Sequence, residues 1–494
     1  MESYHSTYTM ADIQPPDLKI TRRKALALIS AGGLGAVAGL FHLTKESDPT
    51  TNNAGNANES DYIEAESIKE HGGIEGDPSI EAAEANVTAI HQASVASNEN
   101  TVYLPEGEWY VGHRDTGVFL YPGDPDADRG AAGLSFVGEG PAQSFLTVAP
   151  EISGTSENIV VRYSKKEDHH NVEWSGLTYD GNENELDLPV DRSQWGLHLR
   201  GSGAFRFENV RFRNFHANGI LGSASGGYSI DINRCSFYRI AIGRHNNMDG
   251  EVVGHHLGLT IDSDQHLTVR NTMFELVSGT CLDLNPNSRG PVIFNNCWAR
   301  GCGDAFIKVN GGGTTRISQL YFQGTSSELT NALETEPGLG EHHGRNFIYR
   351  LDGDKSNLPE FILNDIEASG MPYHAIQVRR GLSMAIEGGK DGPIVLSDIA
   401  GYEDFHGALR DDDDKESRFD FDIGELSVHG TVGNVFRAPS SVGSINMLNR
   451  DRNGGLGDTG NISIKTDNQG AEPFDPVTPS RDEVGVITVA DDVE

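Results

Sequence analysis

Four charged residues recur at similar places in a series of short apolar–polar–apolar segments: Asp283, Lys308, Arg350 and Arg379. Cations gathered on one surface hold the carboxylates of an acidic polymer, and arginine does so through two parallel hydrogen bonds. The same charges would stabilise the enolate-like charge that develops when a base removes the proton next to a uronate carboxylate. This set is predicted to bind an acidic polysaccharide and to cleave it by β-elimination.

Within the set, Lys308 is the predicted base, because neighbouring arginine charges would favour its neutral, proton-accepting form. Asp283 is predicted to steady the cations, and Arg350 completes the catalytic group. Asp283 and Asp262 could also hold calcium, the one cofactor that the sequence suggests. Predicted substrate-binding residues surround this group: Arg379, His198, Arg200, Asp262, Asn310 and Trp195.

Glycoside hydrolysis is the alternative chemistry. Two carboxylates would then flank the bond, about 6.5–9.5 Å apart for an inverting enzyme. Asp283 could pair with Asp304 or Asp262 in this way. We rank hydrolysis below elimination.

Short strands must position these residues. Alternation along a strand turns the apolar residues inward and the polar ones outward. One outward column is then predicted to run through His198, Asp283, Lys308, Arg350 and Gln377. The column beside it is predicted to hold Arg200, Asn285, Asn310, Asp352 and Arg379. A register slip of one residue would turn any of these side chains to the other face.

A second strand type repeats an eight-residue pattern. Its clearest copies start at Phe205, Ile230, Leu267 and Val292. The starts at 205 and 230 lie 25 residues apart, and so do the starts at 267 and 292. Weaker copies start at Val172, Thr315, Phe361 and Ile394. Alternating strands at this period, without amphipathic helices between them, indicate a β-solenoid whose coils bury a shared core. The pattern also places Asn209, Asn271 and Asn296 in one column, predicted to be a stacked asparagine ladder.

The N-terminal part of the solenoid carries a family resemblance. A helix predicted over 78–96 precedes a strand, a Pro105-Glu106-Gly107 turn and a strand ending at Val111. This opening, together with the segment 176–182, resembles the pectin-lyase-like superfamily. The likeness covers about residues 75 to 450. It implies an all-β fold, a single-stranded right-handed parallel β-helix with a short N-terminal capping helix.

The same resemblance implies a carbohydrate-active protein, but its motifs are weakly specific for chemistry. The superfamily includes lyases, hydrolases, epimerases, esterases and non-catalytic surface proteins. The clustered calcium ligands of pectate lyases and the motifs of polygalacturonases are not evident. A polysaccharide lyase is our first prediction; a hydrolase, an adhesin-like binding protein and a structural β-helix are the alternatives.

Sequence composition divides the chain into five parts. Residues 1–43 hold Arg22-Arg23 before an apolar run and resemble a twin-arginine export signal. If uncleaved, this run would be the only membrane attachment. A disordered linker is predicted over 44–60, an N-terminal cap over 61–112, the β-helix over 113–450 and a tail over 451–494, docked at most as an edge strand.

The overall charge limits the partners. Asp and Glu total 73 against 38 Lys and Arg, a formal net charge of −35. This acidity argues against a nucleic-acid partner, whose phosphates would be repelled. The predicted partner is a polysaccharide, held by the cations of the charged set. The scarcity of lysine resembles the proteins of salt-loving archaea. We expect an extracellular or cell-surface protein, with Cys235 and Cys297 as small buried core residues.

Overall fold

The structure is a computed structural model, and all of the residues that it describes lie in the compact unit Tyr62–Glu494. They are 65–114, 118–122, 132–151, 157–163, 168–182, 193–215, 218–222, 228–240, 259–261, 266–277, 280–284, 290–302, 305–324, 346–350, 358–371, 375–378, 384–389, 391–392, 394–399, 419–429, 436–438, 442–449, 462–466 and 487–491. The predicted export signal and linker lie outside these ranges.

Two sets of parallel strands build the unit. Sheet A contains β1 Glu66–Ser67, β2 Thr101–Leu104, β3 Gly107–Val111, β5 Ser135–Gly138, β6 Ser144–Val148, β8 Asp168–Asp180, β10 Ser202–Arg213, β12 Tyr228–Asn233, β13 Ser236–Ile240, β15 His266–Arg270, β16 Met273–Val277, β18 Val292–Cys302, β20 Thr314–Gln323, β22 Glu360–Met371, β24 Met384–Gly388, β25 Ile394–Ile399, β26 Phe419–His429 and β28 Val442–Asn449. Sheet B contains β4 Val118–Leu120, β7 Glu157–Arg162, β9 Ser193–Leu199, β11 Ile220–Gly222, β14 Leu259–Ile261, β17 Leu282–Leu284, β19 Ala305–Val309, β21 Asn346–Arg350, β23 Ile376–Val378, β27 Phe436–Ala438, β29 Ile462–Thr466 and β30 Ile487–Asp491.

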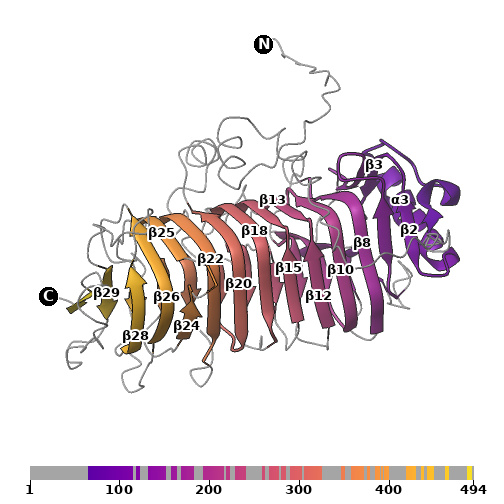
Figure 1. Cartoon of the computed structure of the whole chain (residues 1–494). Coiled ribbons are helices and arrows are strands. Elements are labelled where there is room, and N and C mark those ends of the chain that lie inside the picture. The colour runs from indigo at the N-terminus through magenta and orange to yellow at the C-terminus, as the bar shows by residue number, and fades with distance from the viewer. Residues whose placement is uncertain are drawn as a thin grey trace, which may run out of the picture. The chain divides into compact units, whose positions relative to one another are not determined.

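The chain alternates between the two sheets, and every described pairing is parallel. A strand or strand pair of sheet A is followed by a strand of sheet B from β8 to β23, so each coil stacks on the one before it. Figure 1 shows the long strands of sheet A side by side from β8 to β28. This arrangement confirms the predicted all-β parallel β-helix.

Left-handed residues bend the described coils of sheet A from β8 to β22. Asn209, Asn271 and Asn296 have φ of 55°, 51° and 51°. Asparagine enters this region more easily than most residues, because its short side chain bonds locally. Asn296 Nδ2 donates to Asn271 Oδ1 at 2.7 Å, which confirms the predicted ladder for this pair. Arg234, with φ of 54°, occupies the bend position between Asn209 and Asn271.

The strand register confirms most of the predicted repeat. Val172 pairs with Phe205, and the chain of partners continues through Ile230, Leu267, Val292, Thr315 and Phe361. The last weak copy was wrongly placed. Ile394 pairs with Ile366, beyond the bend, and the partner of Phe361 is Ile386. Strand β24 ends at Gly388, two residues after Ile386, and Gly389 follows it. The two glycines interrupt the eight-residue pattern there.

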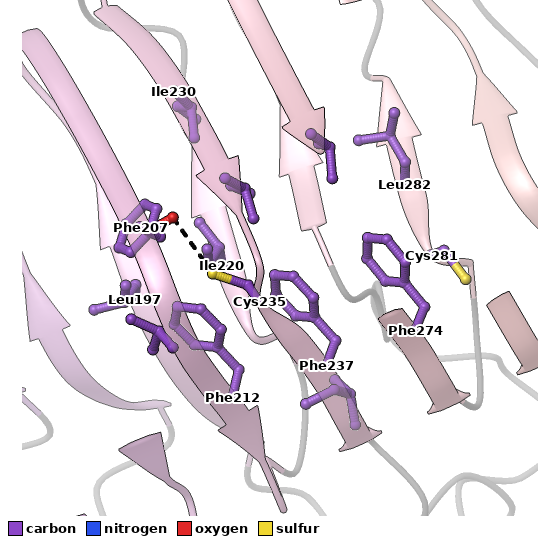
Figure 2. Packing of buried hydrophobic residues seen from close by; sticks show 14 of the residues in the cluster. Leu197, Phe207, Phe212, Ile220, Ile230, Cys235, Phe237, Phe274, Cys281 and Leu282 are labelled. Atoms are coloured by element: carbon purple, nitrogen blue, oxygen red, sulfur yellow. Dashed lines mark hydrogen bonds between the residues drawn. The ribbon is translucent and has the colours of Figure 1, made fainter. Parts of the chain in front are cut away.

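Aromatic rings stack inside the coils. The ring centroids of Phe212 and Phe237, and of Phe237 and Phe274, are both 4.9 Å apart, with nearly parallel planes. Figure 2 shows this stack beside Cys235, whose thiol contacts the carbonyl oxygen of Phe207 at 3.4 Å. Because successive coils place the same side chain at the equivalent position, the core keeps one cross-section along the stack.

The four cysteines divide into two kinds. Cys235 and Cys297 are buried with free thiols, as predicted. Burial raises the pKa of each thiol to about 12, so both remain protonated and unreactive. Cys281 and Cys302 form a disulfide, which the sequence spacing allowed without indicating it.

Helix α3, Ile80–Ala96, caps the first coil and confirms the predicted helix. Ser79 is its N-cap, and the Ser79 hydroxyl accepts from the Ala82 amide. Ile80, Val87 and Ile90 are buried where α3 contacts β2 and β3. The adjacent 3-10 helix η2, Ile68–His71, completes this cap. No helix in the described ranges is long and apolar enough to cross a membrane.

Candidate functional site

The candidate site lies on the outer face of sheet B. Leu282 and Leu284 of β17 are buried in the core, so Asp283 between them lies on the opposite face. Strand pairing extends this position into one continuous register column. The column reads Arg162, His198, Leu221, Thr260, Asp283, Lys308, Tyr349, Gln377, Arg437 and Lys465.

Asp283 and Lys308 meet at the centre of this column. They are register partners on β17 and β19, and Lys308 Nζ lies 3.4 Å from Asp283 Oδ2. The Asp283 side chain is 0% exposed and the Lys308 side chain 17%. Taking an ion pair out of water costs free energy, and apolar residues of similar size would often give equal or greater stability at such a position. The pair is therefore a candidate for function.

Arg350 was wrongly placed in this column. Ile307 pairs with Ile348 and Lys308 with Tyr349, so Tyr349 is the neighbour of Lys308. Arg350 is fully buried and pairs with Val378. Both Ile348-Tyr349-Arg350 and Tyr349-Arg350-Leu351 can be read as alternating strands, and the sequence prediction chose the wrong register.

A signal for the correct register was present in the sequence. Ala305-Phe306-Ile307-Lys308 and Asn346-Phe347-Ile348-Tyr349 share a Phe-Ile pair. The rings of Phe306 and Phe347 are stacked with centroids 5.9 Å apart. Aligning the two phenylalanines would have placed Tyr349 beside Lys308.

The remaining predicted residues fall into three groups. Asn310, just after β19, is 6% exposed, and its backbone N–H donates to the Leu284 carbonyl oxygen at 2.7 Å. Trp195, His198 and Arg200 lie on or directly after β9, near the other end of the described column. Arg379, Asp262 and Asp304 lie outside the described residues, as do Asn285 and Asp352.

A second cluster surrounds His198. Arg162 on β7 is its register partner, and the Trp195 ring centroid lies 6.3 Å from that of His198. Both imidazole nitrogens are buried, and within the described ranges they have no hydrogen-bond partner. Burial, with the charges of Arg162 and Arg200, lowers the pKa of His198 to about 3. His198 is thus neutral at ordinary pH and lies in a locally positive field.

Sequence reasoning missed Arg162 and Tyr349 altogether, along with the register positions of Arg437 and Lys465. The column connects strands separated by insertions of unequal length, so no fixed spacing links these residues. Only the ladder of parallel pairs identifies them.

The described residues offer no set of side chains that could hold a metal ion. Among them, no three His, Cys, Asp or Glu side chains come together as ligands. Asp262, which the sequence pairs with Asp283 for calcium, lies outside the described ranges.

Known proteins resemble this chain in fold. No protein-family model and no curated protein matches it. Among solved structures, the A-module of a mannuronan C-5 epimerase from Azotobacter vinelandii has 14% identity and a TM-score of 0.38, covering 87% of this chain and 100% of that one. The surface adhesin PfbA of Streptococcus pneumoniae has 13% identity and a TM-score of 0.44, covering 78% and 89%. A glycoside hydrolase family 87 α-1,3-glucanase from Streptomyces thermodiastaticus has 12% identity and a TM-score of 0.40, covering 83% and 71%. Likeness at this level leaves the chemistry of the chain to be argued from its own residues.

Proposed function

We propose that this protein is an exported β-helix that binds an acidic, uronate-containing polysaccharide along the outer face of sheet B and cleaves it by β-elimination. One observation carries the proposal: the Asp283–Lys308 ion pair lies desolvated in an outward column that also holds His198 and Arg162. A flat parallel sheet presents such a column at intervals of about 4.8 Å, which suits a long linear ligand.

The ion pair changes the role proposed for Lys308. An ammonium group paired with Asp283 has no lone pair with which to accept a proton. Lys308 instead supplies the positive charge that neutralises the uronate carboxylate and the enolate-like charge formed from it. Asp283 keeps the ammonium in place.

Tyr349 takes the position once given to Arg350. It follows Lys308 in the column and is 6% exposed. In its ionised phenolate form, Tyr349 would accept the proton from the carbon next to the carboxylate. The electron pair of that C–H bond forms the new C=C bond, and the C–O bond to the leaving sugar breaks. The leaving oxygen then takes the proton from the Tyr349 phenol, which restores the phenolate.

Binding without cleavage is the second candidate, and the same ion pair favours it. Within the described part of the column, Asp283 is the one carboxylate, and it is already paired with Lys308. Hydrolysis has less support, since its second carboxylate would have to come from residues outside the described ranges.

Export and high-salt adaptation complete the proposal. They rest on Arg22-Arg23 before an apolar run and on the net charge of −35. Replacing both arginines by lysine should keep the protein inside the cell, because a twin-arginine signal requires the pair. Unchanged secretion of that variant would contradict the export route.

The decisive experiment for activity incubates the purified protein in high salt with a panel of uronate-containing polymers. Products with the ultraviolet absorbance of an unsaturated uronate support elimination, and new reducing ends without that absorbance support hydrolysis. Bound polymer without either product supports the binding protein. Lys308→Ala should abolish turnover, whereas Arg316→Ala, an exposed cation on the next strand of sheet A, should leave it unchanged.

A further inference from the structure

His198 carries an unsatisfied hydrogen-bonding capacity. A neutral imidazole has one N–H donor and one acceptor nitrogen. In His198 both nitrogens are buried, and neither has a hydrogen-bond partner among the residues that the structure describes. Buried polar groups without partners are rare, since each has given up its bonds to water and gained none in return. A sugar hydroxyl both donates and accepts, so it could bond to either nitrogen.

The charges around His198 specify the rest of the ligand. Arg162 lies beside it in register on β7, and Arg200 follows β9 directly. Burial, and after it the charges of Arg162 and Arg200, lowers the pKa of the His198 imidazole. Two cations beside a neutral histidine, in a chain with a net charge of −35, favour an anion at this place. A carboxylate matches the planar fork of arginine.

Trp195 supplies an apolar surface for the same ligand. It lies on β9 with His198, is half-buried, and its ring is tilted by 54° to the imidazole. A pyranose ring has an apolar face of C–H groups, and aromatic side chains with one exposed face are suited to cover it. A uronate carries hydroxyls, a carboxylate and an apolar face, so it matches all three features.

We propose that His198, Arg162, Arg200 and Trp195 form a subsite for one uronate residue, with its hydroxyl at the imidazole and its carboxylate at the arginines. The subsite rests on the proposed function, because it belongs to the same column as Asp283 and Lys308. His198 and Asp283 are separated by three register steps through Leu221 and Thr260, or about 14 Å. The subsite therefore holds a sugar well away from Lys308, and only a longer oligomer reaches both places.

Calorimetric titration tests the subsite independently of turnover. A uronate octasaccharide should bind His198→Gln about tenfold more weakly than the wild type. His266→Gln, an exposed histidine on sheet A, is the matched control and should bind like the wild type. A neutral glucan octasaccharide should bind both proteins weakly and equally. Equal affinity of His198→Gln and wild type for the uronate would overturn the subsite, and so would tighter binding of a sulfated octasaccharide or of inorganic sulfate.

A second measurement uses the unmodified protein and so does not depend on the folding of a variant. The imidazole nitrogen resonances of His198 should shift when the uronate octasaccharide is added, and unshifted resonances would overturn the subsite. The outcomes also separate the two proposals. Weakened binding by His198→Gln without any turnover supports the subsite and removes the lyase chemistry. Full turnover by wild type and His198→Gln alike, with equal affinities, removes the subsite and keeps the chemistry.

Discussion

Different features fix the strand register in sheet A and in sheet B. Strands β8, β10, β18, β20 and β22 of sheet A span 10 to 13 residues and pass through a bend with a left-handed residue. Strands β11, β14, β17 and β23 of sheet B span 3 residues each. A slip in sheet A would displace a bend, a ring stack and an asparagine ladder together. A slip in sheet B displaces few side chains, so the chain is free to carry unusual ones there.

The largest effect on stability is expected when an aromatic ring is removed from the core of sheet A. Phe237→Ala should lower the free energy of unfolding by about 3–5 kcal/mol, because the cavity lies between two stacked rings that cannot close it. Chemical denaturation measures the change. Ile293→Ala, 38% exposed on the same sheet, should change stability by no more than about 0.5 kcal/mol. Equal effects of the two variants would contradict the packing described.

The next test breaks the ion pair of sheet B. Asp283→Ala should cost about 2–3 kcal/mol, because it leaves the Lys308 ammonium largely buried without its partner. This is less than for a fully buried pair, since the Lys308 side chain is 17% exposed.

Replacing the pair by Asp283→Leu with Lys308→Met should recover part of that loss, since no unpaired charge remains. A double-mutant cycle measures the coupling of the two residues. Additive effects of Asp283→Ala and Lys308→Ala would show that they do not interact.

The pH dependence of stability tests the His198 cluster. The pKa of His198 is lowered from 6.5 to about 3 in the folded state. The unfolded chain therefore takes up a proton first, and stability is lost as the pH falls from about 6.5 towards 3, by at most about 1.4 kcal/mol per pH unit. His198→Gln removes this loss, so its stability relative to wild type should rise over that range. A constant difference between the two proteins would mean that the histidine is not buried beside the arginines.

The smallest effect concerns the bend. Asn271→Ala should cost about 1–2 kcal/mol, since alanine is strained at a φ of 51° and the ladder bonds are lost. Asn271→Gly relieves the strain and loses the same bonds, so it should cost less. Thermal unfolding of the two variants checks the order. Equal stability of the two variants would place the stability of the bend in the ladder alone.

Sequence reasoning predicted most of the solenoid, for physical reasons that differ along the chain. The repeat from Val172 to Phe361 was readable because each coil buries the same alternating residues around a bend. It failed at Ile394, where glycines interrupt the pattern, and at Arg350, where a strand of five residues fits two registers. The cluster of His198 and Arg162 joins neighbouring strands whose separation in sequence follows no period, so only the folded chain brings it together.

The most direct test of the proposed site is a crystal structure of the protein with a uronate octasaccharide bound. The chain of sugars should lie along the outer face of sheet B, with one carboxylate beside Lys308 and another between Arg162 and Arg200. An oligosaccharide bound on sheet A, with the outer face of sheet B empty, would contradict the proposed function and the subsite together.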